Sequence, residues 1–62
     1  MYHVTLFFKG NTFPINLLNI KSVYISYSDH IVRCVTKIGK DVKFDTEAFK
    51  IDSVLVRFMD ER

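Results

Sequence analysis

The chain has few cysteines to cross-link a fold and few prolines and glycines to interrupt its strands or helices. Its 62 residues include one cysteine, one proline, two glycines and no tryptophan. Cys34, as the single thiol, cannot form an internal disulfide and cannot supply the paired sulfurs of a CxxC metal or redox motif. A chain of this length buries only about 60% of the surface that it exposes when unfolded. Close packing or oligomerisation must therefore supply the stability that disulfides give to other small proteins.

Long apolar runs are also missing. Uninterrupted apolar stretches extend for only a few residues, as at 6–8 and 54–56, whereas a membrane-spanning helix needs about 20. His3 and Thr5 interrupt the first stretch, so the sequence lacks the basic region and apolar run of a secretory signal. We therefore expect no membrane helix and a cytoplasmic location.

Groups that carry chemistry are scarce. Two glycines cannot build a phosphate-cradling loop. His3, His30 and Cys34 are the residues that invite a catalytic or zinc site, but their spacing matches no ligand pair and a fourth ligand is missing. Cys34 falls in the middle of a predicted strand, on its core face, where a free cysteine behaves as a small hydrophobe. We expect no enzyme activity, metal, cofactor or small-molecule substrate.

What the sequence does contain indicates one folded domain over residues 1–62. Apolar residues make up 48% of the chain and aromatic residues 15%, with nine basic and seven acidic residues, which is too hydrophobic for a disordered tail. Phe, Ile, Asn, Lys and Tyr supply 24 residues, whereas Ala, Gly and Pro supply four. This bias is expected of A+T-rich coding DNA and indicates a low-GC bacterium, its phage or another mobile element, although a β-rich fold favours part of it as well.

The first residues alternate in the manner of a strand. Tyr2, Val4, Leu6 and Phe8 fall on one face of residues 2–9 at a period of two. The Gly10-Asn11 dipeptide that follows tolerates positive φ and predicts a hairpin turn into a short strand at 12–15. Pro14 then belongs at an edge or a bulge, because it has no amide hydrogen for a ladder.

The rest of the chain predicts four more strands. The four strands are predicted at 20–27, 31–38, 41–44 and 51–59. Turns are predicted at Ser28-Asp29 and Gly39-Lys40. Residues 16–19 indicate one helical or irregular turn, and residues 46–50 indicate one helical turn capped by Asp45. The predicted fold class is all-β, or β-rich with one or two single-turn helices, arranged as a small antiparallel barrel or sandwich of five to six short strands. SH3-like and LSm-like barrels have this size, but no motif of either class is present.

The two halves of the chain align at an offset of 31 residues. The alignment matches Phe13 with Phe44, Ile20 with Ile51, Ser22 with Ser53, and Val23 with Val54. It predicts an internal pseudo-twofold repeat, in which each half is a strand, a glycine turn, a short strand, a helical turn and a long strand. The alternative is that any two half-chains with a similar rhythm of strands and turns align this well.

Both faces of the predicted strands are apolar. The face assigned to the core carries Val4, Leu6, Phe8, Val23, Ile25, Val32, Cys34, Val54, Val56 and Phe58. Phe7, Tyr24, Val35 and Leu55 then point the other way, and they form either a second buried layer or a surface that a partner covers. A partner is favoured, and the simplest is a second copy. The sequence thus predicts a non-enzymatic protein-binding module, an accessory or inhibitory protein that acts as a homodimer or covers a host protein. A small structural subunit of a larger assembly fits the same pattern.

A basic stripe supports an alternative function. Residues 1–40 carry a net charge of +4 and residues 41–62 a net charge of −2. Arg33, Lys37, Lys40 and Lys43 follow one predicted hairpin, so they would bind phosphates while Tyr24 or Phe7 stacks on a base of a nucleic acid. A solvated face that discourages edge-to-edge aggregation would carry the same lysines.

Overall fold

The structure, a computed structural model, describes residues 1–10 and 13–59. These residues form one antiparallel sheet and no helix, and so none that could cross a membrane. The strands are β1 (Tyr2–Phe8), β2 (Ile15–Ser26), β3 (Ile31–Thr36), β4 (Asp41–Asp45) and β5 (Ile51–Phe58), in the spatial order β4-β3-β2-β1-β5. The predicted all-β class is confirmed.

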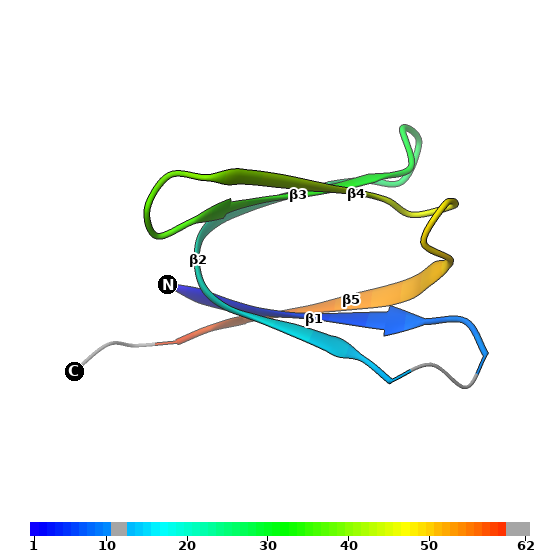
Figure 1. Cartoon of the computed structure of the whole chain (residues 1–62), viewed down its shortest axis with the longest axis horizontal. Helices are drawn as coiled ribbons and strands as arrows, with labels where there is room; N and C mark the ends of the chain where they lie inside the picture. The colour runs from blue at the N-terminus through cyan, green and yellow to red at the C-terminus, as the bar shows by residue number, and fades with distance from the viewer. Residues whose placement is uncertain (11–12, 60–62) are drawn as a thin grey trace.

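Strand β2 gives the sheet its shape. Its first half pairs with β1 and its second half pairs with β3. The register shifts in both pairings, next to Asn19 and Lys21, and such bulges bend a strand and increase its twist. The sheet therefore folds over, with β3 and β4 in one layer, β1 and β5 in the other, and β2 curving between them (Figure 1). The sheet is not closed, because β4 and β5 are its two edges.

The bulge corrects the sequence prediction for residues 16–19. We expected a helical or irregular turn there, but these residues belong to the 12-residue strand β2. The irregularity is Asn19, whose φ is 57°. Asparagine is among the few residues besides glycine that adopt this left-handed conformation readily. The carbonyl of Asn19 accepts a hydrogen bond from the amide of Lys37 at 3.1 Å, so the bulge is tied to the end of β3.

The predicted short strand at 12–15 is wrong. Phe13 and Pro14 lie in the connection between β1 and β2, and β2 begins only at Ile15. Pro14 precedes the strand instead of lying within it, which suits a residue without an amide hydrogen. Gly10 has the positive φ of 87° that the turn prediction requires. Asn11 and Thr12 lie outside the described residues.

The other predicted turns are confirmed, with one difference. Gly39, with φ of 85°, turns the chain from β3 to β4, and Thr36 ends β3 before residues 37–38. Residues 46–50 form the expected single helical turn, in which the amide of Phe49 donates to the carbonyl of Asp45 at 3.1 Å, and this turn does not extend into a helix. One turn of helix is a costly nucleus that needs further residues to propagate, and β5 begins directly after it.

The strand pairing reproduces the predicted internal repeat. Val23 and Ile25 of β2 face Cys34 and Val32 of β3, and the residues 31 positions later, Val54 and Val56 of β5, face Leu6 and Val4 of β1. Both pairings shift register at the same place, directly after the buried Ile20 and Ile51. The residues before these two, Asn19 and Lys50, both have positive φ, of 57° and 53°. The alignment fails at Phe13, which lies in a loop and is 88% exposed, whereas Phe44 lies on β4 and packs against the core.

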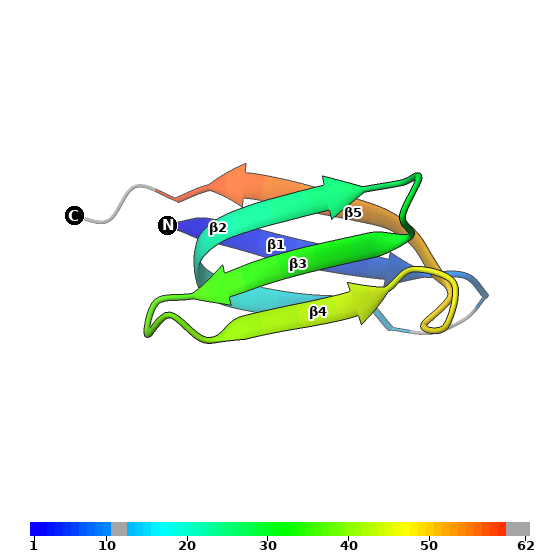
Figure 2. The same cartoon turned by 90° about the horizontal axis from the view of Figure 1, so that it is seen from above.

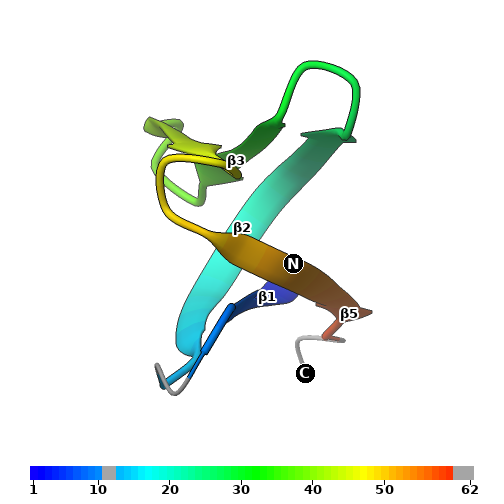
Figure 3. The ribbon, with the colours of Figure 1, turned by 90° about the vertical axis from the view of Figure 1, so that its right-hand side faces the viewer.

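The core lies between the two layers. Its buried residues are Val4, Leu6, Ile20, Val32, Cys34 and Ile51, and the partly buried residues packed against them are Tyr2, Phe8, Leu17, Val23, Ile25, Phe44 and Val54. Most of the predicted core is confirmed. Val56 and Phe58 are the errors, because they are 37% and 68% exposed. They lie near the end of β5, a strand that runs away from the β3–β4 layer toward its end (Figure 3).

Candidate interaction surfaces

The structure divides the predicted interface residues between two surfaces. On β2 and β3, Ser22 lies opposite Val35, and Tyr24 follows on the same side of the sheet. Phe7 and Leu55 lie on β1 and β5, in the other layer. All four residues are on outer faces, but the core separates the layers, so the two outer faces point away from each other (Figure 1). One partner surface formed by all four residues is therefore not available on one molecule.

The β2–β3 surface contains a hollow of about 390 Å³ that opens to solvent. The residues that line it are Ser22, Val23, Tyr24, Arg33 and Val35. Tyr24 is 56% exposed, and Val35 is half-buried. Tyr24 lies directly opposite Arg33 in the β2–β3 ladder. An aromatic side chain, an aliphatic side chain and a guanidinium thus meet in one shallow depression.

Asp41 fixes the guanidinium in this hollow. Nε of Arg33 donates to both carboxylate oxygens of Asp41, at 2.9 and 2.8 Å, and Nη2 lies 2.6 Å from Oδ2. The hydrogen bond from Arg33 lowers the pKa of the Asp41 carboxyl, and the same bond raises the pKa of Arg33. Bidentate pairs of this kind hold the guanidinium plane in one orientation. Arg33 is therefore ordered before any partner arrives.

The same ion pair changes the predicted basic stripe. Arg33 and Lys43 lie opposite each other on β3 and β4, whereas Lys37 and Lys40 lie in the connection between these strands. The structure therefore brings the four residues to one hairpin, as predicted. Asp41 lies among them and neutralises the charge of Arg33. Three lysines around an internal ion pair form a weaker phosphate-binding surface than four separate cations.

A polar network on the opposite outer face was not foreseen. Oγ1 of Thr5 donates to Oδ1 of Asn16 at 2.8 Å, and Nε2 of His3 lies 3.0 Å from the same oxygen. Nη2 of Arg57 lies 3.2 Å from Nδ1 of His3. An oxygen can accept but not donate, so this arrangement fits a neutral imidazole with its proton on Nε2. Asn16 escaped notice because it was assigned to a turn instead of a strand.

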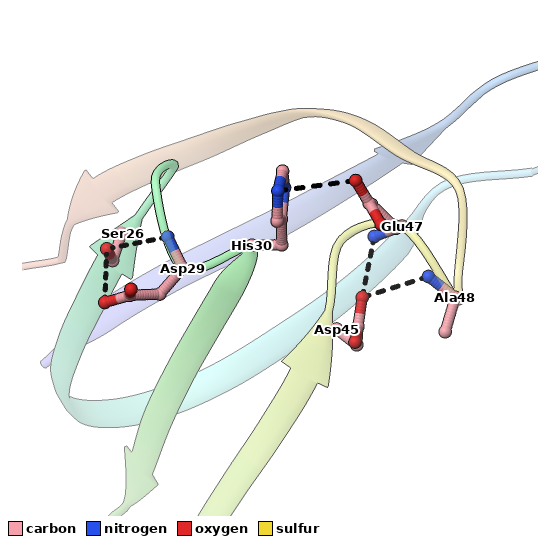
Figure 4. A network of polar contacts seen from close by, with 6 residues as sticks. All are labelled: Ser26, Asp29, His30, Asp45, Glu47 and Ala48. Atoms are coloured by element: carbon pink, nitrogen blue, oxygen red, sulfur yellow. Dashed lines mark hydrogen bonds and ion pairs between the residues drawn. The ribbon is translucent and has the colours of Figure 1, made fainter.

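A second polar cluster joins two turns at one end of the fold (Figure 4). Nε2 of His30, in the β2–β3 turn, lies 3.3 Å from Oε1 of Glu47, and the amide of Thr46 donates to the carbonyl of His30 at 2.9 Å. Oδ1 of Asp45 accepts from the amides of Glu47 and Ala48 at 2.9 and 3.0 Å, which confirms the predicted cap. These bonds lower the pKa of Asp45. The cluster holds the segment that leads into β5.

Apolar side chains are also exposed along β5. Leu55 is exposed on its outer side, and Val56 and Phe58 are exposed on its inner side. The Phe58 ring packs edge-on against Tyr2, with centroids 5.5 Å apart, but 68% of the residue remains accessible. The sequence did not reveal this exposure, because alternation identifies a strand face without showing whether another layer covers it.

The structure also places the groups that could carry a reaction or hold a metal. Cys34, the one thiol, is buried in the core, and its burial raises its pKa. Within residues 1–10 and 13–59, no three His, Cys, Asp or Glu side chains come together as a metal site. Comparison of the chain with known protein families, with curated proteins and with solved structures gave no match.

Proposed function

We propose that the protein is a non-enzymatic protein-binding module whose β2–β3 surface receives an apolar side chain of a partner protein. The observation that carries this proposal is the exposed ring of Tyr24 beside the fixed guanidinium of Arg33, at a hollow that Val35 also lines. Tyrosine and arginine are enriched among the residues that dominate binding energy at protein interfaces, because both combine contact area with hydrogen bonding.

The physical case rests on preorganisation. A flexible arginine loses conformational entropy when a partner orders it, and this loss weakens binding. Asp41 already holds Arg33 in the free protein, so this cost is reduced. Burial of the exposed part of Tyr24 would add about 2 kcal/mol from its apolar area. With the compositional bias described above, we place the module among the cytoplasmic accessory or inhibitory proteins of a low-GC bacterium or its phage.

The test uses a photo-crosslinking amino acid at two exposed aromatic positions. In lysate of the source organism, a benzoylphenylalanine at Tyr24 should capture one protein that the same group at Phe13 does not. Phe13 is the matched control, because it is more exposed than Tyr24 and lies outside the hollow. The captured protein is then purified for titration calorimetry. Tyr24→Ala should weaken its binding at least about tenfold, whereas Phe13→Ala should leave it within about twofold. Equal capture at both positions, or equal affinity of both variants, contradicts the proposal.

Nucleic-acid binding is the second candidate, because Tyr24, Arg33 and Lys43 form one row across three strands. It predicts that a short single-stranded oligonucleotide binds at low salt, with an affinity that falls steeply as salt is added. Replacing Lys37 and Lys40 with Glu should then abolish the change in fluorescence anisotropy. If the wild-type protein gives no binding at low salt, this candidate is excluded.

A further inference from the structure

The two edges of the sheet differ in how they are protected. Exposed edge strands are usually short or carry charged side chains, which prevents them from pairing with another chain. Strand β4 follows this rule, because it has five residues and carries Asp41, Lys43 and Asp45 at alternate positions. Strand β5 has eight residues, and in the described part of the chain it pairs with β1 alone, so its other edge faces outward (Figure 2).

The charged side chains of β5 do not protect the centre of this edge from pairing with another strand. Arg57 extends toward His3 of β1, on the paired side of the strand. Asp52 is the extra residue where the β1–β5 register shifts, near the start of the strand. Between these two charges, residues 53–56 read Ser-Val-Leu-Val. The centre of the edge is therefore an apolar stretch with high strand propensity.

The side chains around this edge are exposed on both sides of the sheet. Leu55 is 44% exposed on the outer side. On the inner side, Val56 and Phe58 are exposed although they belong to the same row as the half-buried Val54. A strand placed beside β5 would shield both sets and would pair its outward backbone groups.

The centre of the edge, Val54-Leu55-Val56, is symmetric about Leu55, and this favours a second copy of the chain as the occupant. We propose that two copies of the chain pair through their β5 strands, antiparallel, with the two-fold axis at Leu55. Leu55 then faces its own counterpart on the outer side, Val54 faces Val56 on the inner side, and Ser53 faces Arg57. Asp52 falls opposite Phe58, so no like charges meet across the interface.

The alternative edge pairing is less suitable. Contact between β4 of one copy and β5 of the next would be heterologous and would continue into an open chain of molecules. It would also set the charged row of β4 against the apolar centre of β5. Pairing of β5 with β5 is isologous and closes at two copies, and it joins two five-stranded sheets into one.

This dimer goes beyond the proposed function and uses a different surface. The hollow at Tyr24 lies on the other layer of each copy, so it stays accessible. A dimer would present the hollow twice, and a partner with two matching sites would bind it with increased avidity. Failure of the dimer would leave binding at Tyr24 intact, and failure of binding at Tyr24 would leave the dimer intact.

The first test is the solution mass of the wild-type protein and two lysine variants. Sedimentation equilibrium should give twice the chain mass of 7.3 kDa for the wild type. Leu55→Lys places two positive charges together at the two-fold axis and should raise the dissociation constant at least about tenfold. Phe7→Lys is the matched control, because Phe7 lies on the same outer face but on β1, and this variant should remain a dimer. Circular dichroism checks that both variants keep the sheet.

A cysteine variant tests the register itself. Opposed residues of an antiparallel pair have Cβ atoms about 5 Å apart, so Leu55→Cys should form an intermolecular disulfide on mild oxidation. Tyr24→Cys, on the other layer, should remain reduced over the same period, and the native Cys34 is buried. A wild-type protein that is monomeric up to about 1 mM overturns the proposal. The proposal is also overturned if Leu55→Lys leaves the dimer unchanged, or if Tyr24→Cys cross-links faster than Leu55→Cys.

Discussion

Two aspartates on this small fold keep their charge for different reasons. Asp41 is held by the guanidinium of Arg33, whereas Asp45 accepts hydrogen bonds from the backbone amides of Glu47 and Ala48. Both interactions favour the ionised carboxylate and lower its pKa below the ordinary value of 3.8. Asp41 orders Arg33 of the candidate site, and Asp45 orders the turn before β5. Protonation of the two carboxylates at low pH therefore weakens both interactions.

The lowered pKa values predict how stability depends on pH. A group whose pKa is lower in the folded state contributes stability above its unfolded pKa, and that stability is lost as pH falls through the folded value. The protein should therefore lose stability below about pH 4. Asp45→Asn keeps an oxygen that can accept the capping bonds but does not titrate, so urea unfolding from about pH 2.5 to 5 should show a smaller pH slope, by up to one proton.

The acid slope of the wild type is the reference for this experiment. Equal slopes for the wild type and Asp45→Asn would show that the backbone bonds of Asp45 do not favour its charged form.

At the scale of the element, the bend of β2 determines the fold. This strand supplies both layers, and its bulge at Asn19 requires a left-handed backbone conformation. Asn19→Val should destabilise the protein by about 1–2 kcal/mol, because a β-branched side chain is strained at positive φ. Asn19→Gly should be neutral or stabilising, since glycine adopts this conformation without strain. Thermal unfolding measures both.

Ser22→Val controls for the change in residue type, because Ser22 lies on the same strand and is paired with Val35 of β3. Valine has high strand propensity there, so this variant should unfold at or above the temperature of the wild type. A loss of about 1 kcal/mol corresponds to about 4–8 °C for a domain of this size. If Asn19→Val and Asn19→Gly unfold at the same temperature, the bulge does not depend on the conformation of residue 19.

The elements that the sequence predicted are those whose signal is local. Period-two alternation identifies residues 2–8 and 31–36 as strands, and Gly39 identifies a turn, because each depends on neighbouring residues. The continuity of β2 was not predictable in this way. Residues 16–19 look like an interruption until their pairing with β1 is known, since the bulge is a property of two strands together.

At the scale of the whole molecule, the layers decide which side chains are accessible. Tyr24 and Leu55 have the same apolar, outward character in the sequence, but the bend in β2 places them on opposite surfaces. Val56 and Phe58 alternate as core residues, but the open sheet leaves them exposed. The candidate residues were therefore predictable as individuals, and their grouping into two separate surfaces required the tertiary structure.

The pairing of β1 with β5 has a consequence for synthesis. Strand β1 lies beside β5, which follows it after three other strands, and the amide of Met59 donates to the carbonyl of Met1 at 2.8 Å. A ribosome makes β1 before β2, β3 and β4, so β1 must wait for all three before it gains its second neighbour. Until then the nascent chain exposes the core face of Val4 and Leu6, and the sheet can be completed only after residue 58 has left the exit tunnel.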